Sequence, residues 1–65
     1  MGSGYGRDIE RLLRDAGCYP VHKGKGNHEI WFSLVSGRNF TLDRGVKLRH
    51  TANGILKDAG LEKAF

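Results

Sequence analysis

The segment from Gly24 to Trp31, with the sequence GKGNHEIW, contains the residue types best suited to chemistry in this 65-residue chain. Its two glycines permit backbone angles that other residues reach only with strain, so the segment predicts a tight turn that places His28 at the start of a strand. Lys23 and Lys25 flank this turn. Because histidine titrates near neutral pH, His28 beside two lysines suits acid–base chemistry on a phosphate group. A plainer interpretation is that the glycines close a hairpin, the lysines keep it soluble, and His28 is an ordinary strand residue.

The charge balance favours a polyanionic partner. Eleven Lys and Arg against seven Asp and Glu give a formal net charge of +4 at pH 7. A second basic cluster, formed by Lys47, Arg49 and His50, precedes the expected second helix, where free backbone amides also attract phosphate. Cations at a helix N-terminus oppose the helix dipole, which favours a functional role over a solubilising one. Lys23, Lys25, Lys47, Arg49 and His50 are therefore the candidate residues for contacts to the phosphates of a nucleic acid, and a solvated rim is the alternative.

Length and cysteine content limit the possible classes of protein. A chain of 65 residues is expected to form one domain over 1–65. The single Cys18 excludes an internal disulfide framework and favours a reducing, cytoplasmic compartment. No stretch resembles a signal peptide or a membrane span. Three histidines and one cysteine do not show the spacing of metal ligands, so neither a metal nor another cofactor is expected.

Apolar spacing predicts two helices. In residues 7–16 one apolar side follows the i, i+3, i+4, i+7 pattern, and Gly17 supplies a stop. The second helix should begin after Thr51 as its N-cap and end at Gly60. Gly54 inside this helix either permits close packing or weakens the helix. Its apolar side consists of Ala52, Ile55, Leu56 and Ala59.

Three short strands are predicted between the helices, over 18–23, 28–34 and 39–42. Pro20 cannot donate to a ladder, so the first strand should lie at an edge. The even residues of the second strand are expected to face the core together with Phe40 and Leu42: His28, Ile30, Phe32 and Leu34. Trp31 should then lie on the open face, with Glu29 and Ser33, and contact either a partner or the C-terminal residues 61–65.

These elements predict an α+β fold with the order α-β-β-β-α. The three strands should form an antiparallel meander, and both helices should cover one face of this sheet. The other face should be open to solvent.

Nearly the whole chain resembles the HicA family of toxin–antitoxin ribonucleases. The resemblance covers the first helix ending in Asp15-Ala16-Gly17, the turn and strand at 24–31, the short third strand, and the segment 49–60 with the sequence RHTANGILKDAG. It implies a fold like the double-stranded-RNA-binding domain. It also implies a toxin that cleaves mRNA, inhibits translation and is neutralised by a HicB-type antitoxin. His28 occupies the place of the histidine taken as catalytic in that family.

The chain departs from the family pattern at two places. Asn27 stands where serine is usual, which keeps a short polar side chain but changes its hydrogen bonds. Leu42-Asp43-Arg44 stands where the family often has Val-Pro and then a basic residue or histidine. The chain segment that follows the third strand is therefore expected to differ from that of the family.

Metal-independent RNA cleavage needs a base for the 2′-hydroxyl proton, an acid for the leaving 5′-oxygen, and cations around the phosphorane. His28 can act as the base or the acid, and Lys25 is the candidate charge stabiliser. The second proton-transfer group is left open among His22, His50, Glu29 and solvent. A non-catalytic RNA-binding module is the leading alternative, and a small structural or complex-forming protein is the third interpretation.

Overall fold

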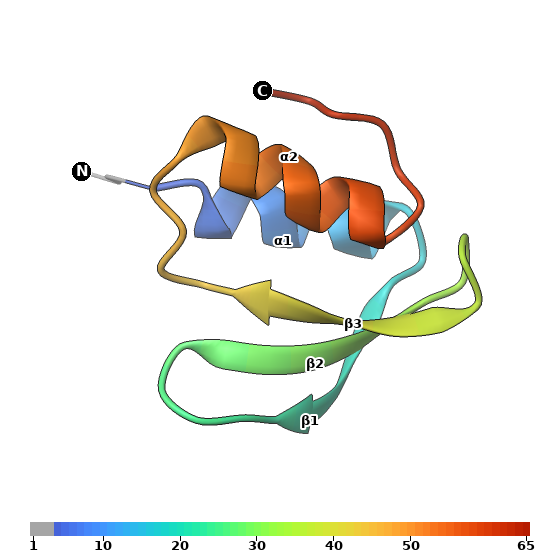
Figure 1. The fold of residues 1–65 in the computed structure, drawn as a ribbon. Helices are drawn as coiled ribbons and strands as arrows, with labels where there is room; N and C mark the ends of the chain where they lie inside the picture. The colour runs from blue at the N-terminus through green and yellow to red at the C-terminus, as the bar shows by residue number, and fades with distance from the viewer. Residues whose placement is uncertain (1–3) are drawn as a thin grey trace.

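The computed structural model describes residues 4–65 and has the order α-β-β-β-α that the sequence predicts. The elements are α1 (Gly6–Asp15), β1 (Tyr19–Lys23), β2 (His28–Ser33), β3 (Arg38–Asp43) and α2 (Arg49–Asp58). The strands form one antiparallel sheet in the order β1-β2-β3. Figure 1 shows both helices on the same side of this sheet, so its other face is uncovered. Residues 1–3, on which the expectation of no signal peptide also rests, lie outside the described range.

Both helices end at the glycines that the sequence indicates. Gly17 follows α1 with φ of 93°, and Gly60 follows α2 with φ of 83°. These are left-handed conformations that glycine adopts without a Cβ penalty, so each glycine stops its helix. On α1, Ile9 and Leu13 are fully buried, as the apolar spacing predicts.

The start of α2 differs from the prediction. The helix begins at Arg49, follows the extended residue Leu48, and has no side-chain cap, so the assignment of Thr51 as N-cap is wrong. The reason lies just upstream, where Val46 is buried and its carbonyl accepts a 3.0 Å hydrogen bond from Tyr5 N–H. This tertiary anchor determines where the chain turns into the helix, and it overrides the local capping preference of threonine.

The first strand is an edge strand, as Pro20 predicts. Its pairing with β2 shifts between Pro20 and His22, so β1 carries one extra residue there. Such a bulge increases twist and makes an edge less suited to pairing with another chain. Cys18, just before the strand, is buried.

The side chains of β2 point to the faces opposite to those predicted. Trp31 and Ser33 are fully buried on the helix side, where Trp31 lies opposite Phe40 and Glu29 lies opposite Leu42. Phe40 and Leu42 are core residues as expected. The even residues of β2 consequently point to the uncovered face, and Leu34 lies beyond the strand as an exposed residue.

Polar contacts explain why Trp31 and Ser33 can be buried. Trp31 Nε1 donates to Glu29 Oε1 at 3.0 Å, and Ser33 Oγ donates to the Ala59 carbonyl at 2.6 Å. Ser33 Oγ also accepts the backbone N–H groups of Val35 and Ser36. Because buried polar atoms need partners, these contacts remove the cost of placing an indole and a hydroxyl in the core. Trp31 therefore cannot anchor a partner from the open face.

The C-terminal residues fold back over the helices. Asn53 of α2 accepts the N–H groups of Ala64 and Phe65 on Oδ1, and its Nδ2 donates to the Phe65 carbonyl. The Phe65 ring lies 4.9 Å from the ring of Tyr5. Figure 1 shows this terminal segment passing above α2. The tail thus ties the beginning of the chain to the second helix.

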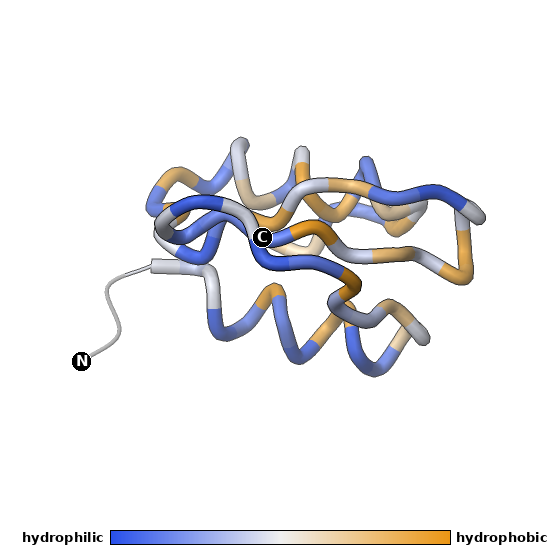
Figure 2. The backbone as a smooth tube through the Cα atoms, turned by 90° about the horizontal axis from the view of Figure 1, so that it is seen from below, coloured by the Kyte–Doolittle hydropathy of each residue, from blue (hydrophilic) through white to orange (hydrophobic). Residues whose placement is uncertain are grey.

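No helix within residues 4–65 combines the length and apolar character needed to cross a membrane. Figure 2 shows hydrophobic residues in short stretches interrupted by hydrophilic ones.

Candidate functional site around His28

A short hairpin loop presents His28 at the first position of β2. Gly24 N–H donates to the His28 carbonyl and His28 N–H donates to the Lys25 carbonyl, both at 3.0 Å. Gly26 has φ of 60°, and a Cβ on Gly24 would lie 3.0 Å from the His28 carbonyl oxygen. The loop is therefore the tight glycine turn that the sequence predicts, and its backbone leaves little freedom in where His28 begins the strand.

The imidazole of His28 lies on the uncovered face beside a carboxylate. Its side chain is 59% exposed, and its Nε2 atom is 3.7 Å from Oδ2 of Asp43. The register of the sheet pairs the two residues, since His28 opens β2 and Asp43 closes β3. Sequence reasoning did not select Asp43 as a site residue, because only the strand register shows that it faces His28.

A backbone hydrogen bond orients the carboxylate of Asp43. Gly45 N–H donates to Asp43 Oδ1 at 2.9 Å, which leaves Oδ2 directed at His28. Arg44 N–H donates to the Asn27 carbonyl at 2.9 Å, so the hairpin loop is fastened to the exit of β3. Two segments distant in the sequence thus hold one histidine–carboxylate pair.

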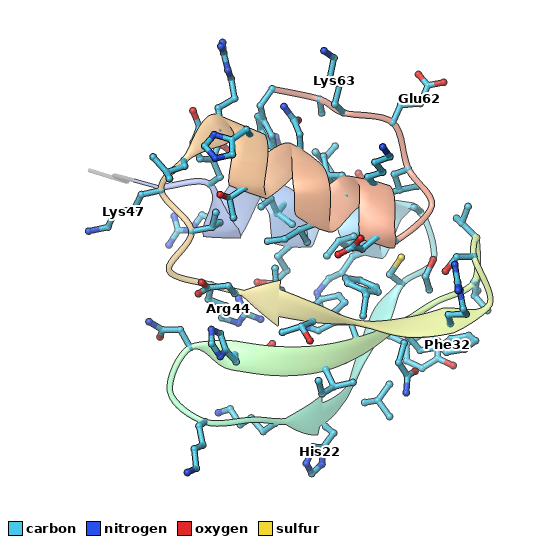
Figure 3. The ribbon with its side chains drawn as sticks, viewed as in Figure 1. His22, Phe32, Arg44, Lys47, Glu62 and Lys63 are labelled. Atoms are coloured by element: carbon cyan, nitrogen blue, oxygen red, sulfur yellow. The ribbon has the colours of Figure 1, made fainter. Side chains whose placement is uncertain are left out.

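The predicted basic residues gather at one end of the molecule but not on one face. Figure 1 shows the β1–β2 loop, the segment 44–48 and the N-terminal end of α2 at this end, and Figure 3 labels Lys47 there. Lys25 lies in the loop, and Arg49 and His50 form the exposed first turn of α2. Lys23 pairs with Glu29 in the register and so shares the helix-side face with it, opposite to His28.

The candidate proton-transfer groups are separated by the fold. Glu29 lies on the helix side, where its carboxylate accepts from Arg44 Nε at 2.8 Å and from Trp31 Nε1. These hydrogen bonds, that of Arg44 above all, lower the pKa of Glu29, and its carboxylate lies on the face of the sheet opposite to His28. His50 lies on α2, whereas His22 pairs with Ile30 and shares the uncovered face with His28.

An ionic network that the sequence did not reveal joins α1 to the sheet. Arg44 binds the carboxylates of both Glu10 and Glu29, and Arg14 Nε donates to Glu10 Oε2 at 2.9 Å. The guanidinium of Arg14 also lies 5.1 Å from the centre of the Trp31 ring. Arg44 and then Arg14 hold the pKa of Glu10 at about 2, and the two carboxylates raise the pKa of Arg44. The network closes across 34 residues of sequence, so no local pattern could indicate it.

The described residues contain no group of three or more His, Cys, Asp and Glu side chains that could hold a metal ion.

No protein-family model, no curated protein and no solved structure matches the chain.

Proposed function

We propose that this protein is a metal-independent endoribonuclease in which His28 is the catalytic residue. The observation that carries the proposal is the exposed His28 imidazole, whose Nε2 atom faces a carboxylate held by a backbone N–H. The HicA-like motifs at 24–31 and 49–60 support the same assignment. They extend it to a cytoplasmic toxin that cleaves mRNA and inhibits translation.

The reaction proceeds without a metal by attack of the ribose 2′-hydroxyl on the adjacent phosphorus. A base removes the 2′-hydroxyl proton, the P–O5′ bond breaks, and an acid protonates the leaving 5′-oxygen, which yields a 2′,3′-cyclic phosphate and a free 5′-hydroxyl. His28 supplies one of these proton transfers. Asp43 orients its ring and stabilises the imidazolium, as a carboxylate does for a catalytic histidine in hydrolases. The distance of 3.7 Å between His28 Nε2 and Asp43 Oδ2 is longer than a hydrogen bond. Catalytic hydrogen bonds are often this long without substrate and shorten when substrate binds.

Cations at the same end of the molecule would hold the RNA backbone. Lys25 lies within the loop that presents His28 and stabilises the charge that develops on the phosphorane. Lys47, Arg49 and His50 contact neighbouring phosphates near the start of α2. This helix has no side-chain cap and no acidic residue in its first turn, so its backbone N–H groups add to the attraction for an anion.

The resemblance also supplies a protein partner, a HicB-type antitoxin. As a neutraliser it should cover the loop at 24–28 and much of the basic end. Trp31 takes no part in this contact, because it is fully buried.

A non-catalytic RNA-binding module is the second candidate. The distance between the candidate acid–base groups favours it. Glu29 is hydrogen-bonded to Arg44 on the opposite face, and His22 pairs with Ile30 and does not lie next to His28. In that case His28 and the lysines bind phosphate without cleaving the chain. Cleavage by the purified wild-type protein decides between the two functions.

The test compares His28→Ala with Val35→Thr, because Val35 is exposed in the hairpin beyond β2 and belongs neither to the catalytic pair nor to the predicted basic residues. We expect His28→Ala to abolish cleavage of a transcript while RNA binding persists, and Val35→Thr to retain the wild-type activity. Thermal melting should change little for both, because surface substitutions usually alter stability by less than about 0.5 kcal/mol. Cleavage by His28→Ala at the wild-type rate would show that the catalytic assignment is wrong.

A further inference from the structure

We propose that the uncovered face of the sheet binds unpaired bases by stacking, so that the RNA bound next to His28 is single-stranded. This inference deepens the proposed function and rests on its choice of RNA as ligand. It concerns the face that carries His28, and its new element is the aromatic residues away from the reacting atoms.

The strand register assembles this face from all three strands. Residues paired in the register project to the same side, and the uncovered side shows three rows. The first row is Tyr19, Phe32 and Asn39, the second is His22, Ile30 and Thr41, and the third is His28 with Asp43. We name these eight residues the open-face platform. His28 therefore belongs to a continuous surface rather than to an isolated turn.

Two aromatic rings lie together at the far end of the platform. The rings of Tyr19 and Phe32 are 5.6 Å apart with an interplanar angle of 43°, and Tyr19 is 47% exposed. Figure 3 shows Phe32 and His22 on the side of the sheet turned away from the helices. Exposed aromatic side chains on a sheet are the surfaces on which single-stranded nucleic acids stack their bases.

The bulge in β1 contributes directly to this arrangement. In a regular strand Tyr19 and His22, three residues apart, would point to opposite faces. The extra residue between Pro20 and His22 restores the alternation, so both side chains reach the platform. An imidazole and two aromatic rings thereby border Ile30 on the same surface.

The distance along β2 matches an extended polynucleotide. His28 and Phe32 lie four residues apart, which is roughly 13 Å in a strand. An extended RNA strand spans this distance in a few nucleotides, so a phosphate can lie at His28 while a base further along stacks on Phe32. Inside a duplex the neighbouring base pairs cover both faces of each base, so the interior of a duplex cannot stack on these rings.

The chemistry of the platform favours RNA over a protein. Five of its eight side chains are polar or ionisable: His22, His28, Asn39, Thr41 and Asp43. The apolar part is confined to Ile30 and the two aromatic rings, whereas the core of a stable protein interface is predominantly apolar. The net charge of +4 and the continuity of the platform with Lys25 and His28 fit a polyanion.

The test measures binding of the His28→Ala chain to a fluorescein-labelled single-stranded oligouridine by anisotropy. Phe32→Leu and Tyr19→Leu, added separately, remove a ring and keep apolar volume. We expect either change to weaken affinity about 5- to 100-fold, the range for loss of one base–aromatic stack. Val35→Thr is the matched control, because Val35 is 51% exposed but lies in the hairpin beyond β2. It should bind as the parent does.

Two further ligands sharpen the measurement. An oligonucleotide of the same length without bases should bind the parent more weakly and should not distinguish it from Phe32→Leu. A hairpin duplex should bind all variants with equal and lower affinity. Tyr19→Leu keeps the test decisive if Phe32→Leu fails to fold, because Tyr19 is the more exposed ring.

Equal affinities of the parent, Phe32→Leu and Tyr19→Leu would overturn the proposal, as would tighter binding of the duplex than of the single strand. A change in the sedimentation of the aromatic variants with unchanged RNA affinity would also overturn it and assign the platform to a protein contact. The outcome is separable from that of the proposed function. Ring-dependent binding without any cleavage by the wild type supports the platform and refutes the ribonuclease, whereas His28-dependent cleavage with ring-independent binding does the reverse.

Discussion

The two faces of β2 differ in how their side chains are used. On the helix side, Glu29, Trp31 and Ser33 are engaged by contacts that reach α1, the exit of β3 and the end of α2. On the other side, His28 is exposed beside Asp43 of β3, and the half-buried ring of Phe32 packs against Tyr19 of β1. One six-residue strand therefore supports stability with one face and presents chemistry with the other.

The two faces show that burial in this domain depends on whether polar atoms have hydrogen-bond partners as well as on hydrophobicity. Trp31 is buried because Glu29 accepts its N–H, and Ser33 because Ala59 accepts its hydroxyl. Ile30 and Phe32 are as apolar as many core residues, yet no helix covers them. Substitutions on the helix side should consequently lower stability, whereas substitutions on the uncovered face should chiefly change the proposed function.

Truncation of Trp31 should give the largest effect. Trp31→Ala removes a fully buried indole and should lower the free energy of unfolding by about 3–5 kcal/mol. Phe32→Ala, one position away on the open face, should cost less than half as much. Guanidinium denaturation of both variants measures the difference, with Trp31→Phe as a milder variant that retains most of the ring volume. Equal losses for Trp31→Ala and Phe32→Ala would contradict the assignment of the two faces.

Removal of Arg44 should have an intermediate effect that depends on pH. Arg44→Met leaves the carboxylates of Glu10 and Glu29 without their shared cation, and should cost about 1–2 kcal/mol at pH 7 after allowance for the partial exposure of Arg44. Arg38→Met, at an exposed arginine that begins β3, is the matched control.

The pH dependence follows from the lowered pKa of Glu10. Its folded value of about 2 lies below the ordinary 4.5, so its ion pairs stabilise the fold above about pH 4.5 and lose that effect as the pH falls toward 2. Arg44→Met should weaken this acid-induced loss, since Arg44 is the principal cause of the shift. Chemical denaturation between pH 7 and pH 3 measures it. The same slope in wild type and variant would mean that the network does not stabilise the protein.

The smallest expected effect is a gain in stability from a substitution in α2. A Cβ at Gly54 would meet no atom within 4 Å, so this glycine does not permit close packing and only weakens α2. Gly54→Ala should raise the free energy of unfolding by up to about 1 kcal/mol. Gly6→Ala is the contrasting variant, because a Cβ there would collide with the Arg44 carbonyl and should destabilise. A loss of stability in Gly54→Ala, measured by thermal melting, would contradict this account of α2.

The sequence was sufficient for features that depend on local chain preferences. Apolar spacing located both helices, Gly17 and Gly60 marked their ends, and Pro20 placed β1 at an edge. The glycine turn before His28 also follows from residue type alone, because few other residues tolerate its backbone angles. The order α-β-β-β-α with both helices on one face follows from these elements and short connections.

Only the tertiary structure decided which face of β2 is buried, where α2 begins, and which group faces His28. The set with Ile30 and Phe32 is the more apolar of the two alternating sets on β2, so hydrophobic alternation favours the face that is in fact uncovered, and a shift of one residue exchanges the two sets. The choice depends on partners far along the chain, since Ala59 lies 26 residues from Ser33 and Arg44 lies 34 from Glu10. Asp43 meets His28 for the same reason, because the register of two strands, and not the spacing of residues, brings them together.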